Sequence, residues 1–149
     1  MMSPVTISPG SQPTGPAASA LEIMLERARA GLNRLTPQQA RAAQLAGALL
    51  IDTRTLEQRI EIGDLPGAIC IDRTVLEWRL DPGGRVTIPE LTSPDALVIV
   101  VCRQGFSSSL AAASLQAIGL PRATDIIGGV EAWIAAGLPL SDAPADVRR

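Results

Sequence analysis

Cys102 is the residue in this 149-residue chain whose surroundings point most clearly to chemistry. It follows the apolar run Leu97-Val98-Ile99-Val100-Val101, which is typical of a buried strand, and it precedes a turn with Gly105 and a helix start at Ser107. The backbone N–H groups of such a turn, and those of the helix start, can stabilise a thiolate. We therefore predict that Cys102 is a nucleophile with a depressed pKa. The alternative is that Cys102 is a small buried apolar side chain at a strand end.

The rest of the composition limits the chemistry in which Cys102 can take part. The chain has no His, which excludes Ser-His-Asp and Cys-His catalysis and any His-ligated metal site within it. The second cysteine, Cys70, lies inside the apolar segment 68–71, where we expect an inert core thiol. Two cysteines are too few for a zinc site built from thiolates alone. We predict that the protein uses no metal and no cofactor.

Charge and hydropathy limit the partners of the chain. Thirteen basic residues, all of them Arg, stand against 15 acidic ones and give a net charge of −2, without a basic run of the kind that binds nucleic acid. No apolar segment approaches the ~20 residues of a membrane helix. The first residues also lack the pattern of a signal peptide. We expect a cytoplasmic protein with neither a nucleic-acid nor a membrane partner, and the oligomeric state stays open.

Short apolar runs alternate with helix signals along the chain. The predicted strands cover residues 48–51, 68–71, 97–101 and 124–127, and the main predicted helices cover 37–46, 56–61, 107–118 and 130–136. This alternation implies parallel βαβ units, and hence an α/β fold with a sheet covered on both faces. We divide the chain into a disordered segment at 1–18, an N-terminal helix at 19–33, one domain at 34–140 and a C-terminal tail at 141–149.

The N-terminal helix is predicted from its start signal and its apolar spacing. Ser19 and Glu22 have the spacing of a capping box, and Gly31 is a plausible end. Apolar residues recur along one face, which we expect to pack against the domain, with a dimer face as the alternative. They are Leu21, Met24, Leu25, Ala28 and Leu32.

The spacing after Cys102 separates two chemistries that use a loop of this kind. A cysteine phosphatase needs an Arg six residues after the nucleophile to clamp the phosphate, and Ser108 occupies that position here. The loop from Cys102 to Ser107 instead carries its only cation, Arg103, directly after the nucleophile. A loop this small suits a single extra sulfur atom better than a tetrahedral phosphate, so a phosphatase is the less favoured interpretation.

Taken together, four motifs resemble those of a single rhodanese-like (thiosulfate sulfurtransferase) domain. They are Leu49–Arg54, similar to the family's hydrophobic-Asp-x-Arg element; Gly63–Ala68, similar to its Gly-His-x-Pro-Gly-Ala turn; the loop Cys102–Ser107; and Gly128–Trp133 with Gly137–Pro139. Asp64 stands where the family usually has His. The resemblance implies a rhodanese-like fold, a five-stranded parallel sheet with helices on both faces, here with an N-terminal helical extension.

The resemblance also implies a function, that of a sulfurtransferase. Cys102 would accept a sulfane sulfur from a small donor such as thiosulfate, carry it as a persulfide and pass it to a thiol or cyanide. Arg103 would hold the anionic group of the donor. The loop amides would stabilise the persulfide, and the implied binding residues are Arg103, Gln104, Gly105, Phe106 and Ser107.

Two further residues of the motifs are expected to support the site rather than to react. Asp52 and Arg54 close the first predicted strand, and we expect them to pair with groups such as Glu57 and with neighbouring backbone.

One feature of the loop leaves a second function open. The pattern Cys-Arg-x-Gly-x-Ser resembles that of two-domain thiosulfate enzymes, whereas many single-domain relatives end the loop with Arg in place of Ser107. Those two-domain enzymes also use contacts from a second domain, which we do not expect in this chain. The alternative function is therefore a non-catalytic rhodanese-like module that binds a partner or relays sulfur, for example to a sulfur-accepting protein.

Overall fold

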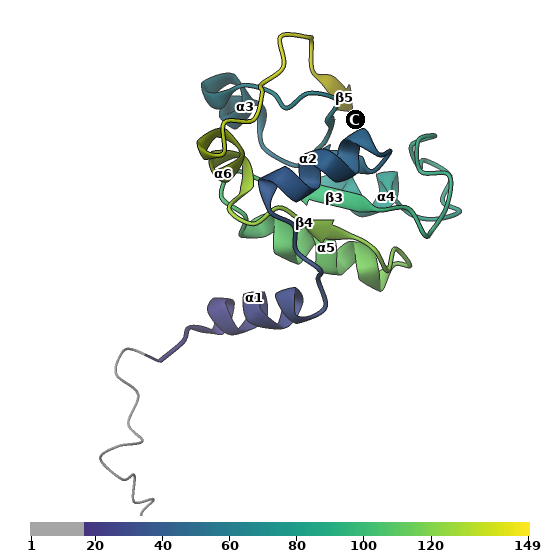
Figure 1. Cartoon of the computed structure of the whole chain (residues 1–149). Coiled ribbons are helices and arrows are strands. Elements are labelled where there is room, and N and C mark those ends of the chain that lie inside the picture. The colour runs from purple at the N-terminus through teal and green to yellow at the C-terminus, as the bar shows by residue number, and fades with distance from the viewer. Residues whose placement is uncertain (1–16) are drawn as a thin grey trace, which may run out of the picture.

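Five parallel strands form one sheet at the centre of the computed structural model, which describes residues 17–149 (Figure 1). The order across the sheet is β4-β3-β1-β2-β5, so that β1 and β3, which precede the motif residues Arg54 and Cys102, are neighbours. The predicted five-stranded parallel α/β sheet is confirmed, and the expectation for residues 1–18 lies almost wholly outside the described residues. The strands are β1 (Leu49–Asp52), β2 (Ile69–Ile71), β3 (Val98–Val101), β4 (Thr124–Asp125) and β5 (Asp146–Arg148).

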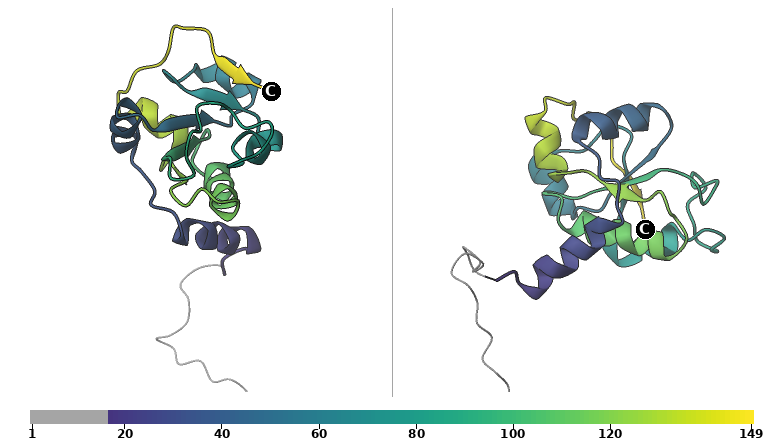
Figure 2. Two further views of the ribbon diagram at one scale, coloured as in Figure 1. Left: turned by 90° about the vertical axis from the view of Figure 1, so that its right-hand side faces the viewer. Right: turned by 60° about the horizontal axis from the view of Figure 1, so that its bottom comes forward.

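Helices cover both faces of the sheet (Figure 2). Successive side chains of a strand point to opposite faces, so strands that are apolar throughout must be covered on both. On one face, Leu50, Ile99 and Val101 pack with α2 (Pro37–Leu45) and α6 (Gly129–Ala135). On the other face, residues of the same strands pack with α4 (Leu76–Arg79), which follows the 3-10 turn η2 (Arg73–Val75), and with α5 (Ser107–Ala117). Helix α3 (Leu56–Ile62) follows β1 directly. The apolar runs are thus buried on both sides, as in other parallel sheets.

Strand β5 corrects the expectation that residues 141–149 are a tail outside the domain. It pairs in parallel with β2, with Ile69 opposite Asp146 and Ile71 opposite Arg148. Arg148 also bonds the Glu90 carboxylate at 2.8 Å, which ties the edge strand to the domain. The strand has only three residues, of which Val147 alone is apolar, so neither a run nor an alternation marks it in the sequence.

Helix α1 (Ala20–Ala30) lies along α5, outside the layers that enclose the sheet (Figures 1 and 2). The predicted capping box is present, since Ser19 Oγ accepts from Glu22 N–H and the Glu22 carboxylate accepts from Ser19 N–H. The predicted apolar face packs only in part, because Leu21 and Met24 are 61% and 50% exposed. No residue of α1 is buried, so polar contacts must contribute to its position.

None of the helices within residues 17–149 combines the length and the apolar character that crossing a membrane requires.

Candidate active site

Cys102 lies directly after β3, at the edge of the sheet where the parallel strands end. Its side chain is almost fully buried, and its Sγ accepts hydrogen bonds from the backbone N–H of Gly105 at 3.2 Å and of Ser108 at 3.3 Å. Ser108 is the second residue of α5, so one donor comes from the loop and the other from the helix start. The structure therefore places a cradle of amides around the sulfur, and the cradle extends one residue beyond the predicted loop.

These contacts determine the acidity of the thiol. Burial alone would raise the pKa of Cys102, but the hydroxyls of Ser108 and Ser107 and the N–H groups of Ser108 and Gly105 outweigh it, so that its pKa lies below the ordinary value. The Ser108 hydroxyl has one hydrogen and also lies 2.8 Å from the Asp125 carboxylate, so it serves one of these acceptors at a time. The backbone donors, in contrast, are fixed on the sulfur.

Two glycines, Gly105 and Gly129, allow the loop to pack against the start of α6. Gly105 has φ +83°, and a Cβ there would lie 2.7 Å from the backbone N of Gly128. A Cβ on Gly129 would lie 2.4 Å from the carbonyl oxygen of Cys102. With these side chains absent, the Val130 N–H donates to that same oxygen at 2.9 Å. The Gly-Gly motif near the C-terminus is therefore a packing partner of the nucleophile's own loop.

An open pocket of about 440 Å³ lies in front of the sulfur. Its lining combines loop residues with three residues that follow β1, which brings together two of the motifs. The loop residues and Arg54 were predicted from the sequence, whereas Thr53 and Gln58 were not. Among the described residues, its walls contain no carboxylate, and no cluster of His, Cys, Asp and Glu suited to a metal occurs in residues 17–149. The lining residues are Thr53, Arg54, Gln58, Cys102, Arg103, Gln104, Phe106 and Ser107.

The Asp52–Arg54 pair supports the wall of this pocket, but not through the predicted partner. Arg54 Nη2 donates to Asp52 Oδ2 at 2.7 Å and to the carbonyl of Gly63 at 2.8 Å, and both charged side chains are fully buried. Glu57 is exposed on α3 and takes no part. The expectation of a Glu57 contact is wrong because Arg54 precedes the helix and its side chain turns back to Asp52.

Arg103, the predicted donor-binding cation, lies on the rim of the pocket. Its Nε is 3.3 Å from the Glu131 carboxylate and its Nη2 is 3.9 Å from that of Glu61, while the side chain remains 41% exposed. An incoming anion would therefore compete with two glutamates for this guanidinium.

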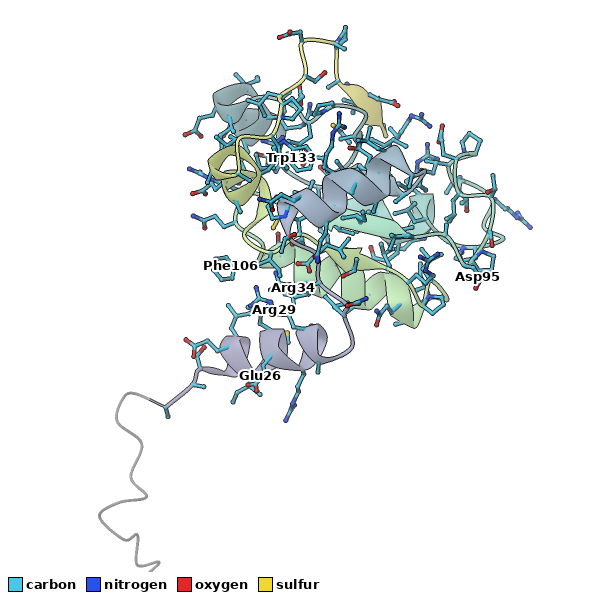
Figure 3. All side chains as sticks on the ribbon, in the orientation of Figure 1. Glu26, Arg29, Arg34, Asp95, Phe106 and Trp133 are labelled. Atoms are coloured by element: carbon cyan, nitrogen blue, oxygen red, sulfur yellow. The ribbon has the colours of Figure 1, made fainter. Side chains whose placement is uncertain are left out.

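A buried polar cluster behind the loop was not foreseen from the sequence. Asp125, at the end of β4, is fully buried and accepts from Arg34 Nε at 2.8 Å and from the hydroxyls of Ser108 and Ser109 at 2.8 and 2.7 Å. Arg29 and Arg34 point towards this region, with Phe106 beside Arg29 (Figure 3). The position of Asp125 at a strand end was a usable signal, whereas nothing near Arg29 or Arg34 in the sequence marks them.

Cys70 is as buried as Cys102, but its pKa is shifted in the opposite direction. It lies within β2 and is 5% exposed. Burial, and next the charge of Asp52, raise its pKa to about 11. These properties match the expected inert thiol.

The fold and the site define a class of α/β protein in which a strand-end cysteine lies in an amide cradle. The rhodanese-like domain family matches residues 36–136, about two thirds of the chain, and the chain belongs to this family. No curated protein sequence matches it.

Solved structures with the same fold include proteins of different description. A protein of unknown function from Rhodopseudomonas palustris, described as a possible tyrosine phosphatase, shares 26% identity and a TM-score of 0.74, over 87% of this chain and 100% of its own. The polysulfide-sulfur transferase homodimer from Wolinella succinogenes shares 24% identity and a TM-score of 0.65, over 81% and 86%. A thiosulfate sulfurtransferase from Pseudomonas aeruginosa shares 22% identity and a TM-score of 0.58, over 79% of this chain and 21% of its own.

Proposed function

We propose that this protein is a sulfurtransferase that moves a sulfane sulfur from a donor such as thiosulfate to a thiol or cyanide through a persulfide on Cys102. The observation that carries this proposal is the pair of N–H groups, from Gly105 and Ser108, that donate to Cys102 Sγ within an open pocket. Fixed backbone donors stabilise negative charge on sulfur in the thiolate, and the same donors can serve the persulfide.

The proposed reaction has two displacement steps. In the first, the Cys102 thiolate attacks the outer sulfur of thiosulfate, a new S–S bond forms, and sulfite leaves with the electron pair of the bond that breaks. In the second, the acceptor attacks the outer sulfur of the persulfide, and the pair of the S–S bond returns to Cys102 as thiolate. With cyanide as acceptor the product is thiocyanate. Neither step requires a proton from the protein, because sulfite and thiolate leave as anions.

The absence of a carboxylate from the described pocket walls favours this chemistry over phosphate ester hydrolysis. A phosphatase protonates its leaving oxygen with a general acid and clamps the phosphate with an Arg six residues after the cysteine. Here Ser108 occupies that position and its side chain is buried against Asp125. The described lining residues therefore offer neither group, whatever the chemistry of the Rhodopseudomonas palustris protein.

Arg103 is the group we propose for recognition of the donor. It lines the pocket beside Cys102, and in the donor complex its guanidinium would exchange Glu131, at 3.3 Å, for the sulfonate. The exposed position allows this exchange, since a guanidinium on the rim moves without opening the core.

A thiocyanate assay with thiosulfate and cyanide tests the proposal. Wild type and Cys70→Ser are expected to form thiocyanate with multiple turnovers, and Cys102→Ser to form none above the uncatalysed rate. Hydrolysis of p-nitrophenyl phosphate is expected to be absent from all three. Wild type without thiocyanate formation would favour the alternative, a binding or relay module, and phosphate release that depends on Cys102 would favour a phosphatase.

A further inference from the structure

We propose that Arg29, on helix α1, is a positioning residue for the Cys102 loop and holds the loop in the conformation in which its N–H groups face the sulfur. The inference rests on the proposed function insofar as Cys102 is the reactive thiol. It assigns to the N-terminal helix a role at a site that lies in the following domain.

Arg29 contacts the loop and the start of α5 with one side chain. Its Nη2 donates to the carbonyl oxygen of Gly105 at 2.7 Å, and its Nε donates to Ser109 Oγ at 3.0 Å. The guanidinium carbon also lies 5.7 Å from the centre of the Phe106 ring, within the range of a cation–π contact. Figure 3 shows Arg29 directed from α1 towards Phe106, with Glu26 on the opposite side of the helix.

The first bond acts on the most adaptable residue of the loop. Gly105 has a positive φ and no side chain to restrict rotation, so its peptide groups reorient easily when nothing holds them. Its N–H donates to Cys102 Sγ, whereas its carbonyl oxygen accepts from Arg29 and, at 3.1 Å, from Arg34. Anchoring that oxygen fixes the plane of the peptide between Gly105 and Phe106, because the peptide is planar. The Gly105 N–H belongs to the preceding peptide, which meets this plane at the Gly105 Cα. Anchoring the oxygen therefore removes one of the two peptide reorientations that could turn the N–H away from the sulfur.

The second bond reaches the other donor to the sulfur through α5. Ser109 Oγ accepts a hydrogen bond from Arg29, and the Ser109 hydroxyl donates one to Asp125 Oδ2 at 2.7 Å. The hydroxyl of Ser108 donates to the same oxygen. The backbone N–H of Ser108 is the group that faces Cys102 Sγ. Arg29 thus holds both sides of the amide cradle, at Gly105 and at the first turn of α5.

The charges around the cluster agree with this role. Arg29, Arg34 and Asp125 together carry one net positive charge, which the Cys102 thiolate would balance. Burial and, next, the neighbouring Arg34 lower the pKa of Arg29, while the negative charges of Asp125 and Cys102 oppose that shift. The arrangement therefore favours the ionised sulfur over the neutral one.

Both arginines precede residue 36, where the match to the rhodanese-like domain begins. Helix α1 has no buried residue, and the side chain of Arg29 joins it to the domain through hydrogen bonds to Gly105 and Ser109. Arg29 and Arg34 therefore lie outside the matched domain but contact the Cys102 loop inside it.

The test compares Arg29→Ala, Arg29→Lys and the control Arg27→Ala, which removes an exposed arginine from the same helix, in the full-length chain. The readouts are the pH dependence of Cys102 alkylation by iodoacetamide and the thermal unfolding midpoint. Arg29→Ala is expected to raise the apparent pKa of Cys102 by about half a unit to one unit, which slows alkylation about 3- to 10-fold at a pH below both pKa values. Arg29→Lys keeps the charge but cannot reach both acceptors as a fork, so we expect only partial recovery. Arg27→Ala is expected to match wild type.

Each remaining outcome would overturn the inference. An unchanged pKa in Arg29→Ala, with or without a lower unfolding midpoint, would mean that the residue is merely structural. Full recovery in Arg29→Lys would mean that charge alone matters, and an equal pKa rise in Arg27→Ala would mean that the contacts of Arg29 are irrelevant. Alkylation requires no sulfur donor, so the result stands even if wild type forms no persulfide, which would refute only the proposed function.

Discussion

Replacement of Gly105 by Ala tests the amide cradle directly, because two separate effects of the substitution can be isolated. At φ +83° an L-residue is strained by about 1–2 kcal/mol. In addition, the new Cβ would lie 2.7 Å from the backbone N of Gly128 and 3.1 Å from the carbonyl oxygen of Ile126. Backbone atoms cannot rotate away from such a contact, so the loop itself must move.

The expected size of the effect on the sulfur follows from the hydrogen bond that this movement breaks. The Gly105 N–H donates to Cys102 Sγ at 3.2 Å. A hydrogen bond to a charged acceptor contributes about 1.5–3 kcal/mol, and one pKa unit corresponds to about 1.4 kcal/mol. Loss of this donor should therefore raise the pKa of Cys102 by about 1–2 units, and slow its alkylation by about 10- to 100-fold at a pH below both pKa values.

Gly137→Ala is the matched control. Gly137 has φ +75°, close to that of Gly105, but a Cβ there would meet no atom within 4 Å. The control carries the backbone strain without the collision, so we expect a loss of stability of about 1–2 kcal/mol and no change in the pKa of Cys102.

The assay measures the rate of iodoacetamide alkylation against pH, with the modified residue located by mass spectrometry. Cys70 reacts little at pH values well below 11, since its pKa is raised to about 11. Denaturant unfolding confirms that each variant is folded and gives the loss of stability. A folded Gly105→Ala variant with the wild-type pKa, or an equal pKa rise in Gly137→Ala, would refute the argument that the loop amides activate the sulfur.

Three further predictions concern the rim of the pocket, the buried cluster behind the loop and the second cysteine. Arg103→Ala should raise the KM for thiosulfate more than it lowers kcat. Glu131→Gln, which removes the carboxylate 3.3 Å from Arg103, should lower that KM. Steady-state kinetics in which neither variant changes KM would contradict the role of Arg103 in donor binding. Asp125→Asn leaves Arg34 without the charge of its fully buried partner and should lower the free energy of unfolding by about 3–5 kcal/mol, so a loss below about 1 kcal/mol in denaturant titrations would show that the cluster does not stabilise the fold. Because burial raises the pKa of Cys70 to about 11 from 9.0, the unfolded chain loses this proton first, and the free energy of unfolding should fall as the pH rises from 9.0 towards 11. Cys70→Ala should remove that part of the decline, and an unchanged decline would show that the thiol is not its source.

The strands of the core were predictable because their signal is local. β1 and β3 are short apolar runs, and burial on both faces of a parallel sheet requires such runs. The helix starts were equally local, as the capping box of α1 illustrates. β5 has no comparable signal, because an edge strand of three residues obtains its order from pairing with β2 rather than from its own composition.

The residues of the site also differ in whether a local sequence signal marks them. Cys102, Gly105 and the loop could be identified because a strand end, a glycine turn and a helix start are consecutive in the chain. The contacts of Arg29 and Arg34 behind the loop could not be identified from the sequence, since Arg29 meets Ser109 across 80 residues and Arg34 meets Asp125 across 91. The predicted contact of Arg54 with Glu57 was wrong because the Arg54 guanidinium donates to the Asp52 carboxylate, which precedes it in the chain, and not to Glu57 on the following helix.

Intact mass spectrometry of the protein, after incubation with thiosulfate and removal of the excess, decides the claim that Cys102 carries sulfur. Wild type and Cys70→Ser should each gain about 32 Da, the mass of one sulfur atom, and a reducing thiol should remove the gain. Cys102→Ser should gain nothing. A gain of the same size in Cys102→Ser, or no gain in wild type with either thiosulfate or polysulfide as donor, would contradict the claim.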